Sequence, residues 1–204
     1  MLRPASLTCG LLAVFLAGTA LAAPPGLPDR PPQAGEREGA RKAPPPLTLD
    51  DLYGRLRESG DEEEAKGVAK LIERRLDRSG SATADLLTER ARQAMSAKDF
   101  PLAAELMDRV TALEPSWSEG WNRRATVFWL LSDKQAAVAD LQRALVLEPR
   151  HFEAWAALGR IYQSMDDKKR ALNAFRRATA LYPRMPRMQE AVDRLAPEVD
   201  GRDL

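Results

Sequence analysis

The sequence predicts an all-α fold, a solenoid of antiparallel helical hairpins stacked on one another. Prolines recur every 34 residues, at Pro115, Pro149 and Pro183, and Trp121 and Trp155 keep the same interval. Small and apolar residues between these markers repeat in the same register. A fixed period in this range is typical of repeat proteins in which each unit is one pair of helices that neighbouring units must cover.

The first 22 residues have the features of an export signal. Arg3 supplies a positive charge, residues 11–21 form an apolar run too short to span a bilayer, and the run ends in Ala-Leu-Ala. We expect cleavage after Ala22, with Ala23 as the alternative; an uncleaved membrane anchor is the other interpretation. Because Cys9 is the only cysteine, the mature chain would have no disulfide and no thiolate ligand. A signal of this form favours the periplasm.

Residues 23–46 are predicted to be a disordered linker. They are rich in proline, glycine and charge and nearly lack large apolar side chains, so they cannot bury enough surface to offset the entropy of ordering. Their proline runs favour an extended polyproline conformation.

Residues 47–83 predict a divergent helical hairpin. Thr48 with Asp51, and Asp61 with Glu64, have the spacing of capping boxes at two helix starts. The segment lacks the 34-residue pattern. Since a solenoid needs covered ends, we expect this hairpin to cap the stack on its N-terminal side.

Three units follow, at 84–117, 118–151 and 152–185. The third carries the clearest motif, which consists of Trp155, Leu158, Gly159, Tyr162, Ala171, Phe175, Ala178 and Pro183. These residues resemble the tetratricopeptide repeat (TPR) family at each of its marker positions. The second unit departs from the pattern with Arg124 at a leucine position, and the first keeps only Ala91, Ala103 and Pro115.

The resemblance implies a right-handed superhelix, and the residue types give it a physical basis. Spacings of three and four place Trp155, Leu158 and Tyr162 on one helical stripe, while Gly159 is small enough for a close approach of the paired helix. After the third unit, 186–204 predicts one capping helix that ends at Leu195, before Ala196 and Pro197, followed by a frayed tail.

Composition and residue content argue against catalysis and nucleic-acid binding. The 31 basic and 30 acidic side chains leave a net charge of +1, without the basic excess that phosphate backbones attract. The mature chain has one histidine, His151, and no motif of metal ligands or of a glycine-rich phosphate loop. We expect no enzyme, no cofactor and no metal site, with His151 in a turn as a solvated or packing residue.

The resemblance implies where a partner binds. In the family, the first helices of the units line a concave groove, and the matching positions here are Arg92, Glu119, Asn122, Arg123, Thr126, Trp129, Glu153, Arg160 and Gln163. Arginines can hold carboxylates by paired hydrogen bonds, and Trp129 offers a rigid apolar surface. An alternative interpretation packs Trp129 against the next unit and leaves the arginines solvated.

Two functions fit the sequence. The first is a periplasmic adaptor that binds a peptide or protein partner of unknown identity in the groove. The second is a structural subunit of an envelope assembly that uses convex or terminal surfaces, because solenoids serve both uses. The clamp of lysines and asparagines by which some members bind chaperone tails is not preserved, and its places hold Thr88, Arg92, Arg123, Glu153 and Ala157.

Overall fold

Nine helices and no strand make up residues 47–201, the part of the chain that the computed structural model describes. The helices are α1 (Leu49–Glu58), α2 (Glu62–Leu76), α3 (Ala82–Ser96), α4 (Phe100–Leu113), α5 (Ser118–Leu130), α6 (Lys134–Leu147), α7 (Phe152–Ser164), α8 (Lys168–Leu181) and α9 (Met188–Asp200). None of these helices is long and apolar enough to span a bilayer. The expected signal peptide (1–22) and linker (23–46) lie outside the described residues, as do residues 202–204.

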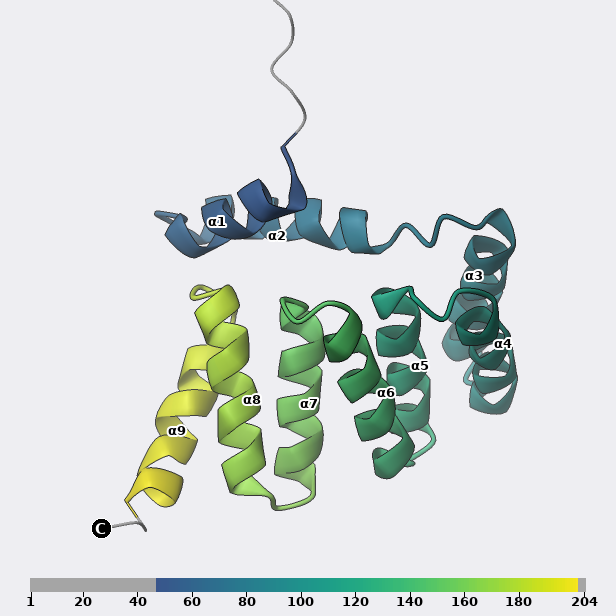
Figure 1. The fold of residues 1–204 in the computed structure, drawn as a ribbon. Helices are drawn as coiled ribbons and strands as arrows, with labels where there is room; N and C mark the ends of the chain where they lie inside the picture. Colours follow the sequence, from purple (N-terminus) through teal and green to yellow (C-terminus); the bar gives the residue numbers. More distant parts are fainter. Residues whose placement is uncertain (1–46, 202–204) are drawn as a thin grey trace, which may run out of the picture. The chain divides into compact units, whose positions relative to one another are not determined.

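Helices α3 to α9 stand side by side in chain order (Figure 1). Within the units, α3 packs on α4, α5 on α6 and α7 on α8. Between them, α4 packs on α5, α6 on α7 and α8 on α9. This arrangement confirms the predicted all-α solenoid of stacked hairpins.

The turn inside each unit has the same construction three times. A residue with a positive φ, between 58° and 64°, precedes an aspartate whose carboxylate accepts a hydrogen bond from the backbone of the second helix. An N-terminal cap of this kind satisfies a backbone N–H group that the helix itself leaves unpaired. The pairs are Lys98–Asp99, Ser132–Asp133 and Asp166–Asp167.

The tryptophans and prolines that mark the period are joined by hydrogen bonds. The indole N–H of Trp121 donates to the carbonyl oxygen of Pro115 at 3.1 Å, and Trp155 donates to Pro149 at 2.9 Å. Each bond ties the first helix of a unit to the turn that precedes it. The period therefore reflects a repeated contact as well as repeated helices.

The two helices of the third unit approach closely at Gly159. A Cβ atom on this glycine would lie 2.5 Å from Cδ1 of Phe175, inside the ring's van der Waals surface. The first and second units place alanine at the matching position and pair it with Met107 and Leu141, which are buried there. The predicted role of Gly159 in close packing is confirmed.

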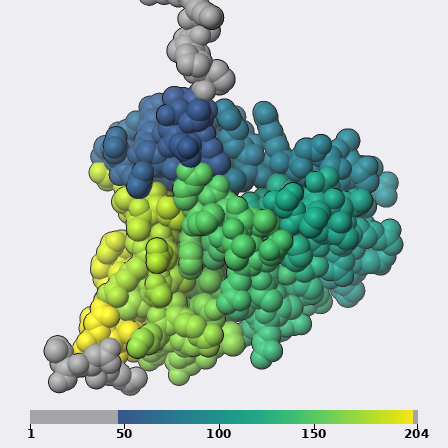
Figure 2. Space-filling view, viewed as in Figure 1, coloured from purple at the N-terminus to yellow at the C-terminus, as the bar shows by residue number. Residues whose placement is uncertain are grey.

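The α1–α2 hairpin begins as predicted but lies elsewhere than expected. The capping box at Thr48 is present, with Thr48 Oγ1 accepting from the backbone N–H of Asp51 at 3.1 Å. The apolar side chains of the hairpin share a core with Phe152, the first residue of α7, and with Tyr182, which directly follows α8. The hairpin thus covers the edge formed by the inter-unit turns, as Figures 1 and 2 show, instead of stacking on α3.

The last helix extends further than the sequence predicted. We expected it to end before Pro197, but α9 continues through this proline to Asp200. Beyond the proline, Val199 packs against the apolar core that α9 shares with α7 and α8. The carboxylate of Glu198 pairs with Lys168 of α8 at 2.6 Å, and that of Asp200 pairs with Arg176 at 2.5 Å.

Candidate functional site

Two adjoining pockets follow the first helices of the three units. The pocket between α5 and α7 has a volume of about 180 Å³ and is lined by Ala125, Thr126, Trp129, Leu141, Ala157, Arg160 and Ile161. The pocket between α3 and α5, of about 140 Å³, is lined by Thr88, Ala91, Arg92, Met95, Met107, Arg123 and Thr126. Because they share Thr126, the two pockets form one surface, which we call the groove.

Trp129 lies in the last turn of α5. The sequence left two interpretations for it, an exposed binding surface or packing against the next unit, and the structure has features of both. It lines the pocket together with Ala157 and Ile161 of the next unit, yet 39% of its surface is exposed. Its ring therefore forms a wall of the groove that a ligand can reach. Exposed tryptophan beside a pocket is the residue type that most often dominates binding energy in interfaces.

Arg160, on α7, lines the same pocket as Trp129 and is the arginine of the groove whose side chain is not already paired. Among the described residues it makes no hydrogen bond or ion pair, whereas Arg92 is held by Glu89 at 2.6 Å and Arg123 by Glu119 at 2.7 Å. Partial burial lowers the pKa of Arg160, and the charge of Glu153 opposes this shift. An arginine remains ionised under such a shift, so Arg160 can bind a carboxylate in a site already partly shielded from water.

Three of the predicted groove residues, Glu119, Asn122 and Arg123, take part in a network under the hairpin. Glu119, only 7% exposed, accepts hydrogen bonds from Asn122 at 2.9 Å and Arg123 at 2.7 Å. Arg123 also pairs with Asp77, which directly follows α2. We call Asp77, Glu119, Asn122, Arg123 and His151 the edge cluster.

His151 is the most buried member of the edge cluster, at 1% exposed. Its Nδ1 accepts from the backbone N–H of Ala154 and caps α7, so its Nε2 carries the proton and donates to Glu119 at 2.9 Å. Of the roles expected from the sequence, solvated or packing residue, the structure supports the second. His151 connects the turn before α7 to the first turn of α5.

The carboxylates near this cluster repel one another. Burial and the charges of Glu119 and Glu73 raise the pKa of Glu153 to about 7. Burial and the charges of Asp77 and Glu119 likewise raise the pKa of Glu73. Burial also opposes ionisation of Glu119, but the hydrogen bond from His151 and the charge of Arg123 outweigh it, so the pKa of Glu119 is lowered.

The side chains of Glu119, His151 and Glu153 place possible ligand atoms within 4.8 Å of one another, close enough to surround a metal ion. Both ring nitrogens of His151 have hydrogen-bond partners, however, and Glu119 is held by Asn122 and Arg123. We interpret the group as a hydrogen-bonded link between helices. The expected absence of a metal or other cofactor stays a prediction.

The structure thus divides the predicted groove residues into two sets. Arg92, Thr126, Trp129 and Arg160 line the groove; Glu119 and Asn122 belong to the edge cluster, and Arg123 contributes to both. Glu153 lies beside the edge cluster. Gln163, half-buried in the last turn of α7, lines neither pocket.

Sequence reasoning missed two features of this region. Asp77 and Glu73 belong to the hairpin, which lies outside the repeat, so no spacing signal could place them beside α5. Arg124, noted above only as a departure from the repeat, is held by both carboxylate oxygens of Asp140 at 2.7 Å and by Asp108 of the preceding unit at 3.0 Å. An arginine at a leucine position therefore ties two units together.

Comparison with known proteins agrees with this geometry. The sequence profile of the tetratricopeptide repeat matches residues 152–185. The fold is of the TPR type. A TPR repeat-containing protein of Rhizobium etli is 34% identical over 98 residues, which are 48% of this chain and 48% of the relative. The chain spans about half the length of this curated relative.

Solved structures superpose on the described helices. The first TPR domain of Spaghetti (RPAP3), bound to an HSP90 peptide, matches with a TM-score of 0.56 and 16% identity, over 59% of this chain and 95% of that domain. MamA matches with a TM-score of 0.54 and 21% identity, over 78% and 88% of the two chains. At these identities the likeness concerns the fold alone.

Proposed function

We propose that this protein is a non-catalytic interaction module that binds an extended peptide segment of another protein in the groove. The observation that carries the proposal is the pairing of Trp129, an exposed apolar wall, with Arg160, a cation without a partner among the described residues, on opposite sides of one pocket. TPR structures that hold peptides, such as that of RPAP3, support the same use of the fold.

The chemistry of the pocket supports a particular kind of ligand. Ala125, Leu141 and Ile161 give it an apolar lining, which fits one bulky apolar side chain against the indole ring. A carboxylate placed beside that side chain can accept hydrogen bonds from the Arg160 guanidinium. We therefore propose a peptide that carries an apolar residue next to an acidic residue or a chain end.

Selection from a random peptide library displayed on phage tests this proposal, followed by affinity measurement with synthetic peptides. Trp129→Ala and Arg160→Ala should each raise the Kd at least about tenfold, since hot-spot side chains contribute more than about 1.4 kcal/mol. Arg177→Ala on α8, an exposed arginine outside both pockets, is the matched control and should bind as the parent chain does. Equal affinity of all four proteins, or no enriched peptide, would refute the proposal.

Arg123→Glu is not suitable for this test, although Arg123 is among the predicted groove residues. Arg123 pairs with Glu119 and Asp77, so a carboxylate at this place would repel its neighbours and loosen the fold. Loss of binding in that variant would not distinguish a contact from misfolding.

We also propose that the module acts in the periplasm. The support is the export signal in residues 1–22. Cell fractionation with N-terminal sequencing checks this: we expect the periplasmic protein to begin at Ala23, and an intact N-terminus in the cytosol would contradict it.

A further inference from the structure

The two pockets of the groove are one structure that the repeat produces twice. When the 34-residue period is subtracted from the seven residues that line the α5–α7 pocket, six of the results are residues that line the α3–α5 pocket. The matching pairs are Ala125 and Ala91, Thr126 and Arg92, Trp129 and Met95, Leu141 and Met107, Ala157 and Arg123, and Arg160 and Thr126. The two pockets therefore lie one repeat apart along the groove.

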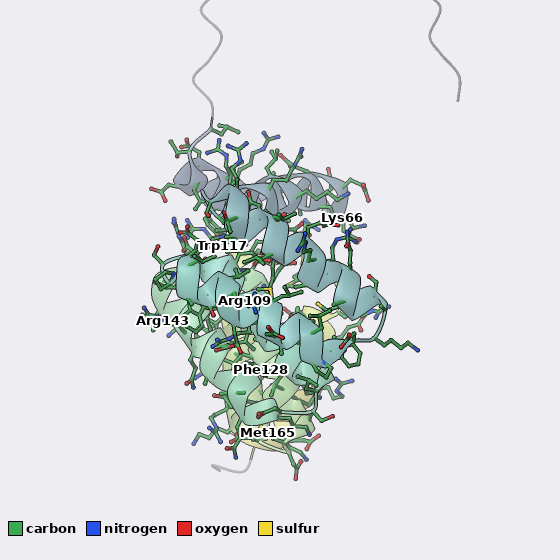
Figure 3. The ribbon with its side chains drawn as sticks, turned by 90° about the vertical axis from the view of Figure 1, so that its right-hand side faces the viewer. Lys66, Arg109, Trp117, Phe128, Arg143 and Met165 are labelled. Carbon is green, nitrogen blue, oxygen red and sulfur yellow. The ribbon has the colours of Figure 1, made fainter. Side chains whose placement is uncertain are left out.

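We call the pocket between α5 and α7 the inner pocket and the pocket between α3 and α5 the outer pocket. Figure 3 views the molecule from the α3–α4 side, and no other described helix lies in front of these two. A peptide that follows the groove from α7 towards α3 thus passes the inner pocket first and the outer pocket second.

The spacing of the repeat limits which peptide positions can fill both pockets. Neighbouring helices in a stack are about 8–10 Å apart, so pockets that differ by one repeat are separated by about the same distance. In a polyproline II conformation every third side chain lies on the same face, at intervals of about 9 Å. In a β-strand the same-face interval is about 7 Å. The groove therefore fits two side chains three residues apart on a polyproline II backbone.

The outer pocket differs from the inner one in charge. Thr126 stands where the inner pocket has Arg160. Two arginines also line the outer pocket, but Arg92 is held by Glu89 at 2.6 Å. Arg123 is held by Glu119 at 2.7 Å. Both cations of this pocket are thus already neutralised, and the pocket is suited to an uncharged side chain.

The outer pocket also contains a buried hydroxyl group without a partner. Thr88, which lines this pocket, is 7% exposed, and its Oγ1 makes no hydrogen bond among the described residues. Thr111 shows the usual arrangement, since its buried Oγ1 donates to the carbonyl oxygen of Met107 at 3.1 Å. A buried hydroxyl without a partner destabilises the fold, because it gives up its hydrogen bonds to water. A ligand that hydrogen-bonds Thr88 would remove this penalty.

A ligand reaches Thr88 only when the lining of the outer pocket adjusts, because Oγ1 is enclosed in the free chain. Met95 is the adaptable part of this lining. It is half-buried, and a methionine side chain has three rotatable bonds that let it repack around a ligand. The inner pocket has the rigid ring of Trp129 at the same position.

We infer that the outer pocket is a second anchor site for the peptide that binds in the inner pocket, and that it selects an uncharged side chain with a hydrogen-bonding group. Asparagine, glutamine, serine and threonine have such side chains. The second anchor lies three residues from the apolar residue that packs on Trp129. This inference rests on the proposed function, because it assigns another position of the same peptide.

The sequences of peptides selected from the phage library test the spacing. Aligned on their apolar residue, they should show a second enriched position three residues away, occupied by asparagine, glutamine, serine or threonine. Enriched peptides that share the apolar residue but have no preference at that distance would overturn the second anchor and leave the proposed function standing. A selection without any enriched peptide would refute both.

Thr88→Val tests the hydroxyl group, because valine keeps the branched shape of threonine. The Kd of a peptide with the polar second anchor should rise about three- to tenfold, the range for one hydrogen bond between uncharged groups. A peptide with alanine at that position should bind the variant and the parent equally. The melting temperature of the free variant should not fall, since the hydroxyl has no partner to lose.

Thr111→Val is the matched control. Thr111 lines neither pocket, and its hydroxyl bonds Met107 and Arg124. This variant should melt at a lower temperature than the parent and bind both peptides as the parent does. A Thr88→Val variant that binds both peptides like the parent, or that melts as low as Thr111→Val, would overturn the role assigned to the Thr88 hydroxyl.

Discussion

Helices α5 and α7 present two surfaces that the sequence does not distinguish. Their first turns lie under the α1–α2 hairpin, where Glu119 and His151 are buried and hydrogen-bonded. Their C-terminal halves line the groove, where Trp129 and Arg160 are accessible. The same helix face is thus covered by the hairpin near the turn edge and accessible further along.

The difference shows that repeat position alone does not define a binding residue. The family pattern assigns Arg123 and Arg160 the same kind of role. Arg123 also lines the groove, but its guanidinium is paired with Asp77 and Glu119, whereas Arg160 has no such partner among the described residues. Substitutions in the edge cluster should therefore change stability, and those in the groove should change binding. Three matched comparisons test this separation.

Two tryptophans give the largest expected contrast. Trp117 is 8% exposed, and its indole N–H donates to the carbonyl oxygen of Leu76 at 2.6 Å, which fixes the end of α2. Trp117→Ala should lower the free energy of unfolding by about 3–5 kcal/mol through lost burial and the cavity it leaves. Trp129→Ala should lower it by about 1–2 kcal/mol, less than Trp117→Ala, because 39% of the Trp129 surface is already exposed. Urea denaturation of the two variants measures this, and equal losses would break the comparison.

Substitutions of two arginines should differ less in their effect on the free energy of unfolding. Arg123→Ala leaves the buried carboxylate of Glu119 without its charged partner and should cost about 1.5–3 kcal/mol. Amide hydrogen exchange in α2 should accelerate at the same time, because the link to Asp77 is lost. Arg160→Ala should change stability by no more than about 0.5 kcal/mol. Faster exchange in α2 of the Arg160 variant would contradict the proposed division.

Substitution of Glu153 should have the smallest effect on stability, and the sign of its pH dependence can be predicted. Its pKa is raised from 4.5 to about 7, so the folded protein binds a proton more tightly than the unfolded chain does. This group favours folding below about pH 4.5, and that contribution is lost as the pH rises through 7. Glu153→Gln should therefore stabilise the protein by about 1 kcal/mol at pH 8 and leave it unchanged at pH 4.

Thermal unfolding at the two pH values checks this prediction. Glu190→Gln on α9, where the carboxylate is exposed, is the control and should show no such pH dependence. A Glu153 variant equally stable to the parent at pH 8 would mean that the carboxylates near the edge cluster do not repel one another as described.

The repeat made most of the fold predictable. Periodic prolines, tryptophans and alanines located the six helices of the three units, and Gly159 indicated where two of them meet closely. The position of the α1–α2 hairpin could not be predicted, because Phe152 and Tyr182, which bury its apolar face, also occupy ordinary repeat positions. The extension of α9 through Pro197 is accompanied by packing of Ala196 and Val199 on the core and by ion pairs with α8, which local propensity does not reveal.

The groove was predictable to the same extent. The family pattern located Arg92, Thr126, Trp129 and Arg160, since these depend only on the stacking of first helices. It could not separate them from Glu119, Asn122 and Arg123, because their different role comes from Asp77 and the hairpin outside the repeat. The sequence did not reveal that the α1–α2 hairpin covers the edge formed by the inter-unit turns.

Amide hydrogen exchange with a selected peptide tests the central claim most directly. If partners bind in the open groove, exchange should slow in residues 125–130 of α5 and 157–161 of α7, while α4, α6 and α8 stay unchanged. Slowing confined to these second helices, or to the hairpin-covered turns, would show that the protein binds its partners on another surface.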